Sequence, residues 1–289
     1  MTSPAAVATV AEVRVPTGGM RHEARATLVV WQREMIRFWH DRTRILASTM
    51  QPLLFLFVLG TGLSSLVSAG SAGVDFRTFL FPGVLATSVL FTAVFSGISI
   101  VWDREFGFLR EMLVAPITST SIMLGKCLGG ATIAVLQSLL ILVLCGIVGV
   151  PYNPVMLLEL VGLLFVMAFA ITAMGLLMAA RIKQIQSAMP LVQLAVAPMM
   201  FLSGALFPLA NLPAWLAVVT RLNPLTYAVQ PMRYVVFEHL DVSPQARAAL
   251  DPGVTWWSWT LPIWFQIVLV VALGVGMLGV ATLRFARTE

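Results

Sequence analysis

A charged stretch at residues 103–111 carries the side chains best suited to recognition chemistry. Its ionisable residues are Asp103, Arg104, Glu105, Arg110 and Glu111. Phe106, Leu109 and Leu113 recur at three- and four-residue steps, which places them on one face of a helix. A short helix with apolar anchors and flanking charges is suited to docking into a groove on a partner protein. A solvated loop that caps a helix is the alternative, and composition alone leaves the two open.

The sequence contains no motif for phosphate binding, metal binding or nucleophilic catalysis. Gly125-Lys126 has the form of the end of a phosphate-binding loop, but Thr120 stands where that loop needs its first glycine, and Cys127 follows the lysine instead of Ser or Thr. The three histidines are scattered and show no metal-ligand spacing. We therefore expect no catalytic residue, no metal site and no cofactor bound by this chain.

Polar side chains within the apolar segments are candidates for lining a solute pathway. Gln137 and Gln193 carry amides, and Glu159 is the exception among predicted spans that are nearly free of charge. Met199 and Phe201 would suit a lipophilic route. Each of these residues also has an ordinary explanation. Glu159 can reach the outer membrane interface, and the amides can form hydrogen bonds between neighbouring helices. Apolar side chains in spans face the core or the lipid by default.

The elements that position these residues follow from composition. Of 289 residues, 59% are hydrophobic and only 11% are charged, with a mean hydropathy of +0.92, whereas soluble domains are about 25% charged. The apolar runs are long enough to cross a hydrocarbon core about 30 Å thick as helices. The sequence therefore predicts an all-α, polytopic membrane protein. Its roughly six transmembrane helices are expected at 45–67, 79–101, 121–149, 156–180, 188–209 and 262–283.

The N-terminal region divides into two parts before the transmembrane domain of residues 45–289. Residues 1–21 have no periodicity and predict a disordered cytoplasmic tail. Residues 22–44 predict an amphipathic helix in which aromatic residues such as Trp31 alternate with basic ones such as Arg33. Such a helix lies in the headgroup plane of an anionic leaflet, or it packs on a partner subunit.

The distribution of Arg and Lys predicts the orientation. Fourteen of the 18 basic residues lie on the side of the N-terminus, and four lie on the opposite side. The positive-inside rule places the first side, with both chain termini, in the cytoplasm. Because the basic residues flank the spans, we attribute the net charge of +5 to membrane orientation and expect no nucleic-acid partner.

A proline-rich segment precedes the last predicted span. Pro208, Pro213 and Pro224 interrupt helices in succession, and Asn223 is a residue type that caps helices. Short broken helices are tolerated at membrane depth where they line a cavity or pack against protein. We predict re-entrant outer helices between spans 5 and 6, with an ordinary external loop and amphipathic helix as the alternative.

Two stretches resemble a known family. Asp-Arg-Glu-Phe-Gly-Phe-Leu-Arg-Glu-Met-Leu-Val-Ala-Pro at 103–116, followed by Leu-Gly-Lys at 124–126, looks like the cytoplasmic motif of ABC-2 type permeases. It is closest to the daunorubicin-resistance type of drug-export permease. The second stretch combines Ser-Gly-Ala-Leu-Phe-Pro at 203–208, Leu-Pro-Ala-Trp-Leu at 212–216 and Asn-Pro-Leu-Thr-Tyr at 223–227. The resemblance covers nearly the whole chain.

The resemblance implies roles for particular residues. A coupling helix on an ATPase subunit would comprise Asp103, Arg104, Glu105, Phe106, Gly107, Phe108, Leu109, Arg110 and Glu111. A re-entrant outer gate would comprise Gly204, Phe207, Pro208, Pro213, Trp215, Asn223, Pro224 and Tyr227. Residues 22–44 would be the interfacial connecting helix.

The resemblance also implies a function, which is that of the permease subunit of an ATP-binding cassette exporter in the bacterial inner membrane. Two ATPase subunits would bind the ATP and Mg, and a second permease copy or a related permease would complete the assembly among membrane lipids. The cargo would be a lipophilic drug, lipid or secondary metabolite, moved by alternating access. A polysaccharide or glycolipid exporter, an ion-coupled secondary transporter and a scaffold that recruits an ATPase are the alternatives.

Overall fold

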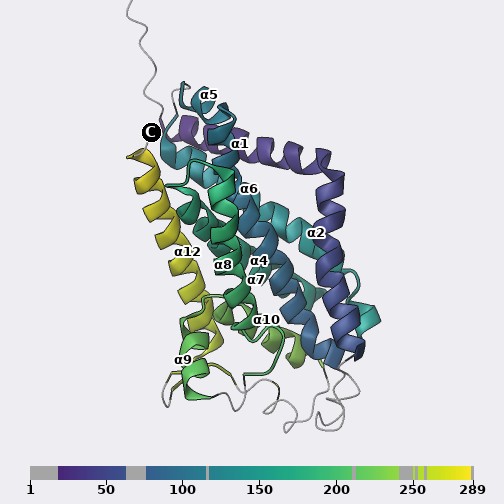
Figure 1. Cartoon of the computed structure of the whole chain (residues 1–289). Helices are drawn as coiled ribbons and strands as arrows, with labels where there is room; N and C mark the ends of the chain where they lie inside the picture. Colours follow the sequence, from purple (N-terminus) through teal and green to yellow (C-terminus); the bar gives the residue numbers. More distant parts are fainter. Residues whose placement is uncertain are drawn as a thin grey trace, which may run out of the picture.

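In the computed structural model, long helices run side by side as a bundle, and α1 (Met20–His40) lies across one end (Figure 1). The structure describes residues 19–62, 76–114, 117–209, 213–240, 250, 253–256 and 259–287. The other elements are α2 (Arg42–Leu54), η1 (Phe55–Leu59), α4 (Phe76–Glu105), α5 (Phe108–Val114), α6 (Ser119–Leu142), η2 (Cys145–Val148), α7 (Pro154–Ala179), α8 (Ile185–Phe201), α9 (Ala214–Leu222), α10 (Thr226–Glu238), β1 (Thr255–Trp256), β2 (Trp259–Thr260) and α12 (Ile263–Ala286). We call the end that carries α1 and α5 the α1 end, and the end that carries α9 and α10 the α9 end.

Five helical segments in the described ranges are long and apolar enough to cross a membrane, namely Ile45–Gly62, α4, α6, α7 and α12. The predicted span 188–209 corresponds to α8, which is apolar but has 17 residues. Apart from the two-residue strands β1 and β2, which pair with each other, the described elements are helical. The prediction of an all-α polytopic membrane protein is confirmed.

Several helix boundaries differ from the prediction: α4 is longer than the predicted span 79–101, and α8 ends at Phe201, before the predicted residue 209. Two further differences have a visible cause in the backbone. The predicted span 121–149 ends at Leu142, and the chain continues through η2 to Gly149, whose φ of +79° favours glycine and stops the helix. The predicted interfacial helix 22–44 ends at His40, because the chain turns at Asp41 into α2. Residues 1–18 of the predicted tail lie outside the described residues.

α4 forms the centre of the bundle, and close glycine contacts join it to α6 and α7. A Cβ atom added at Gly97 of α4 would lie 2.6 Å from the Thr172 carbonyl oxygen of α7 and 2.8 Å from the Gly175 backbone. On α6, a Cβ atom at Gly130 would lie 2.7 Å from the Thr172 side chain. Small residues let helices approach closely where lipid offers no hydrophobic driving force. These three helices therefore form a tightly packed core.

α1 packs on α6 along a second line of glycines. Gly125 lies against Val30, and Gly129 lies against Glu34. Large apolar side chains elsewhere on α1 are exposed, namely Leu28, Val29, Ile36 and Trp39. α1 is thus bound to the bundle by one face, and it presents apolar side chains away from the bundle.

α9 and α10 lie at the end of the bundle opposite α1 (Figure 1). α10 is buried against α4, α7 and α12, whereas α9 exposes Trp215, Val218 and Leu222. Two short helices are therefore present between α8 and α12, where the sequence predicts them. Their depth in a membrane stays a prediction.

Candidate functional site

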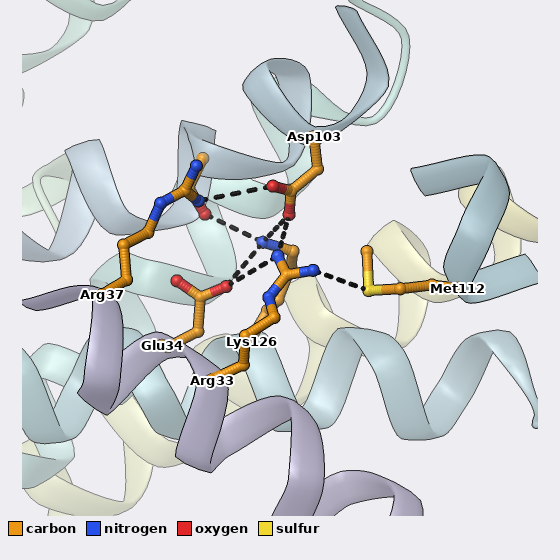
Figure 2. A network of polar contacts seen from close by, with 7 residues as sticks. Arg33, Glu34, Arg37, Asp103, Met112 and Lys126 are labelled. Atoms are coloured by element: carbon orange, nitrogen blue, oxygen red, sulfur yellow. Dashed lines mark hydrogen bonds and ion pairs between the residues drawn. The ribbon is translucent and has the colours of Figure 1, made fainter. Parts of the chain in front are cut away.

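A network of charges lies at the α1 end, where α1, α4 and α6 meet (Figure 2). Glu34, Asp103 and Lys126 are buried, whereas Arg33 is partly exposed and Arg37 is exposed. Asp103 of α4 is at its centre, with Oδ2 2.6 Å from Arg33 Nη2 and 2.5 Å from Lys126 Nζ. Its Oδ1 accepts a hydrogen bond from Arg37 Nη1 at 3.3 Å. Glu34 Oε1 pairs with Lys126 Nζ at 3.0 Å. One carboxylate of α4 therefore binds side chains from two other helices.

Lys126 is only 1% exposed, although lysine is almost never fully buried without partners. Its three N–H donors are matched by Glu34, Asp103 and the hydroxyl of Ser99, the last at 3.0 Å. A buried ion pair is sustained when hydrogen bonds satisfy the remaining donors in this way. Because cations surround both carboxylates, the cluster does not offer the open negative site that a metal ion needs.

Glu34 is ionised in this network. Burial by itself raises the pKa of its carboxyl, but the Lys126 ammonium outweighs this effect and holds the pKa below its ordinary value. The Arg33 guanidinium lowers the pKa further, against the opposing charge of Asp103. At neutral pH the Glu34 carboxylate is therefore available as an anionic partner for Lys126.

Arg104 and Glu105 hold the connection between α7 and α8. The Arg104 guanidinium donates to the carbonyl oxygen of Ala179, the last residue of α7, and to that of Ile182 just beyond it. The Glu105 carboxylate accepts from the backbone N–H of Ile185, the first residue of α8, at 2.8 Å. A cation at a helix C-terminus and an anion at a helix N-terminus both interact favourably with the backbone dipoles.

A turn divides the predicted docking segment into two parts. Residues 103–105 complete α4 and are not part of a separate short helix. Phe106 and Gly107 form the turn, and α5 begins at Phe108. Gly107 has a φ of +82°, a conformation that favours glycine and ends a helix. The predicted single helix is therefore interrupted by this glycine.

α5 turns one side toward the charge network and the other away from the bundle. Leu109 is buried, and Met112 Sδ accepts a hydrogen bond from Arg33 Nη1 at 3.2 Å, as Figure 2 shows. Among the described side chains of residues 105–114, the exposed ones are Glu105, Phe106, Phe108, Glu111 and Val114. Phe106 and Leu109 therefore do not share a face as predicted. The side chains of Arg110 and Leu113 lie outside the described residues.

Lys126 and Glu34 were missed as members of this site. The predicted span 121–149 contains Lys126, but the distribution of basic residues counts it only as a charge that orients the chain, whereas the structure buries it inside the bundle. A local signal was present, since Thr118 is a residue type that begins helices, and its Oγ1 accepts from the N–H of Ser121. A helix that begins there carries Lys126 into the bundle.

Three of the predicted outer-gate residues fix the chain between α8 and α10. Gly204 has a left-handed backbone conformation, with a φ of +74°. Asn223 Nδ2 donates to the Met199 carbonyl at 2.8 Å, and the Tyr227 hydroxyl donates to a backbone carbonyl at the end of α9. The other predicted gate residues divide into Pro213 and Trp215, which are exposed, and Phe207, Pro208 and Pro224, which are partly buried.

Arg233 of α10 is a second buried cation, which sequence reasoning assigned only to the outer side. Its guanidinium donates to the Gly204 carbonyl and lies 4.3 Å from the centre of the Phe79 ring. On α4, a Cβ atom added at Gly83 would lie 1.8 Å from the Ala205 carbonyl oxygen. α10 and α4 thus enclose the turn that follows α8.

The predicted pathway residues do not gather in one place. The Gln137 amide is buried, and it donates to Ser48 Oγ at 2.5 Å and accepts from Thr92 Oγ1 at 2.8 Å. These bonds join α6 to α2 and α4, which is the packing role that sequence analysis gave as the alternative. The others are Glu159, Gln193 and Phe201, which are exposed, and Met199, which is partly buried.

Comparisons with known proteins point to one family of membrane proteins. The model of the family described as ABC-2 type transporter matches residues 25–237. The chain is 29% identical over 210 residues to the transport permease ycf38 of Porphyra purpurea, with 71% of each chain covered. It is 28% identical over 244 residues to Nodulation protein J of Rhizobium leguminosarum bv. viciae, with 83% of this chain and 90% of that protein covered. The matched region includes the whole charge network.

Proposed function

The chain belongs to the ABC-2 type transporter family and is thus a multi-pass permease subunit of an ATP-binding cassette transporter, and we propose that it exports a lipophilic drug, lipid or secondary metabolite. The family implies a partner that carries the ATPase. We propose that two ATPase subunits, which bind the ATP and Mg, assemble with two permease chains. The second permease is another copy of this chain or a related one.

The exposed side of α5 is the observation that carries the proposal. Phe106 is 61% exposed, Phe108 is 48% exposed and Val114 is 86% exposed. Three apolar side chains on one short segment form the kind of anchor that docks into a groove, and the exposed Glu111 beside them would set the register. We assign this surface to the ATPase subunit.

The α1 end lies in the cytoplasm in this proposal, with both chain termini on the same side. Arg21 and Arg25 are exposed near the start of α1, and the large apolar side chains of Ile36 and Trp39 are exposed further along it. Basic and aromatic side chains on one helix match an anionic headgroup layer. This supports a place for α1 at the inner surface of the bacterial cell membrane.

ATP binding would draw the two ATPase subunits together and push on both copies of α5. The bundle would then switch between inward and outward exposure, and the α9 end would open to release the cargo. Apolar side chains exposed on α8, such as Leu191, Leu194 and Phe201, support a lipophilic cargo over a highly charged one. By reciprocity, the cargo would also change the affinity of the ATPase for nucleotide.

The test uses the purified chain with its ATPase partner in lipid vesicles. ATP-dependent movement of daunorubicin and of a fluorescent phospholipid is measured for the parent and for Phe106→Ala with Phe108→Ala. The double variant is expected to bind the ATPase about 30-fold more weakly, as loss of an interface hot spot does, and to lose transport. Trp259→Ala with Trp264→Ala is the matched control, because it removes two exposed aromatic rings far from α5.

Unchanged ATPase binding and transport in the Phe106 and Phe108 double variant would contradict the docking role of α5. Transport that needs a proton gradient and not ATP would contradict the proposal of an ATP-driven exporter and would favour an ion-coupled transporter. ATPase binding without movement of either probe would contradict the lipophilic cargo.

A further inference from the structure

Three consecutive residues at the end of α4 reach four other helices. Successive residues of a helix are rotated by about 100°, so Asp103, Arg104 and Glu105 leave α4 in three directions. Asp103 binds side chains of α1 and α6. Arg104 binds the C-terminal carbonyl groups of α7, and Glu105 binds the first N–H of α8. The end of α4 is therefore a junction of five helices.

The junction holds both ends of the short α7–α8 connection. α7 ends at Ala179 and α8 begins at Ile185. Because Arg104 and Glu105 are adjacent in the chain, the end of α7 and the start of α8 are bound to neighbouring positions of α4. Charge-assisted hydrogen bonds are stronger than neutral ones. α7 and α8 must therefore follow the end of α4 when it moves.

α5 is attached directly to this junction. Only Phe106 and Gly107 separate Glu105 from the start of α5. A second connection runs through Arg33, which contacts Met112 of α5 and Asp103 of α4 at the same time (Figure 2). A displacement of α5 thus reaches the junction both through the backbone and through a side-chain contact.

Each side chain of the junction has a partner within the chain, although Glu105 is exposed. Asp103 is buried, and its two oxygens are bound by Arg33, Arg37 and Lys126. Arg104 and Glu105 bind the backbone of the α7–α8 connection. A partner protein that used these groups for contact would have to break these bonds, whereas the exposed side chains of α5 are open to it.

We propose that Asp103, Arg104 and Glu105 are positioning residues, which convert a movement of α5 into a joint movement of α1, α6, α7 and α8 without contacting the ATPase. The inference rests on the proposed function, in which the ATPase binds α5. It divides the predicted coupling segment into a contact part, residues 106–114, and a transmitting part, residues 103–105.

The test measures whether a nucleotide-driven change still reaches the α9 end. The complete complex with the ATPase is placed in vesicles, with Trp215→Cys as a reporter, because Trp215 is exposed and the native cysteines are buried. The rate at which a maleimide labels this thiol is measured without nucleotide and with ATP plus vanadate. Glu105→Ala and Arg104→Lys are compared with Glu238→Ala, the same truncation at an exposed carboxyl of α10.

Both junction variants are expected to keep ATPase binding and ATP hydrolysis while the nucleotide-dependent ratio of labelling rates falls. The expected fall is about 2- to 30-fold, the size of coupling changes that single substitutions outside binding sites produce. Glu238→Ala should keep the parental ratio. Arg104→Lys retains the positive charge and loses only the planar fork that reaches several carbonyl oxygens, so it tests transmission with little risk to folding.

Parental labelling ratios in both junction variants would overturn the inference. Loss of ATPase binding with unchanged thermal stability would also overturn it, because the triplet would then be a docking surface. A parent complex that binds the ATPase and shows no nucleotide-dependent change at position 215 would instead refute the proposed function, and this inference with it.

Discussion

The two ends of the bundle hold buried cations in different ways. At the α1 end, Lys126 is paired with the carboxylates of Glu34 and Asp103. At the α9 end, the described contacts of the Arg233 guanidinium include the Gly204 carbonyl and the Phe79 ring. The first arrangement joins side chains of three long helices, and the second joins a helix to the turn that follows α8.

The difference lies in what happens when one partner is lost. Removing one member of a buried ion pair leaves an uncompensated charge, so the remaining groups have no acceptable alternative. A buried neutral carbonyl that loses its donor costs less, about 1–3 kcal/mol. The α1 end is therefore suited to transmitting a displacement without yielding, as the proposed route from α5 requires.

Lys126→Met tests the α1 end most directly and has the largest expected effect. It leaves two buried carboxylates without their common partner and is expected to lower the free energy of unfolding by about 3–5 kcal/mol. Thermal unfolding of the purified chain in detergent measures the loss. Adding Glu34→Gln should recover part of it, since one of the unpaired charges is removed. A double variant no more stable than the single one would show that the charges are not what holds this end.

Gly83→Ala tests the packing of the α9 end. The new Cβ atom would lie 1.8 Å from the Ala205 carbonyl oxygen, so the turn after α8 must move. Overpacking of this kind is expected to cost about 3 kcal/mol, read from the same unfolding measurement. Gly276→Ala on α12 is the matched control, because nothing lies within 4 Å of its added Cβ atom. Equal stability of the two variants would contradict a close approach of α4 to this turn.

Arg233→Met tests the contacts of the buried cation at the α9 end. It removes a charged donor from the Gly204 carbonyl and is expected to cost about 2 kcal/mol in the free energy of unfolding, less than Lys126→Met. Arg233→Lys should cost less than Arg233→Met, since it keeps a donor and a charge. A loss as large as that of Lys126→Met would show that the two ends are held with equal strength and would remove the contrast between them.

Acid is expected to loosen α1 before it loosens α10, which is the smallest of the four effects. Hydrogen bonds from Ser121 and Thr118 lower the pKa of Glu23 below its ordinary value of 4.5, and the pKa of Glu34 is lowered as well, because Lys126 outweighs the opposing effect of burial. A carboxyl whose pKa is lower in the folded state contributes stability that is present above the unfolded pKa and is lost as the pH falls through the folded pKa.

Hydrogen exchange of the α1 and α10 amides, corrected for intrinsic rates, between neutral pH and about pH 3 measures this order. Protection of α1 should fall first. In the variant Glu23→Gln, amides near the start of α1 should show a smaller loss of protection between neutral pH and acid, because the titrating carboxyl is absent. Simultaneous loss of protection in both helices would contradict a carboxylate-held α1 end.

Local patterns in the sequence were enough for the class, the family and most helices. The apolar runs behind α4, α7 and α12 predicted their positions, because hydropathy over one span needs no knowledge of its neighbours. The resemblance at residues 103–116 is confirmed by the family match over 25–237. The helix of the docking segment was predicted as well, but the single turn at Gly107 changed which residues it contains.

Hydropathy, helical periodicity and the positions of prolines can all be read from the sequence without knowledge of the fold. By themselves they established that this chain crosses a membrane, that residues 103–116 are charged and amphipathic, and that prolines interrupt the helices before α12. Only the tertiary structure decided what the faces of these helices meet. Lys126 binds Glu34 from 92 residues away in the chain, and Arg104 and Glu105 bind the backbone of the α7–α8 connection. Such pairs depend on the convergence of separate helices at one end of the bundle, which no local pattern records.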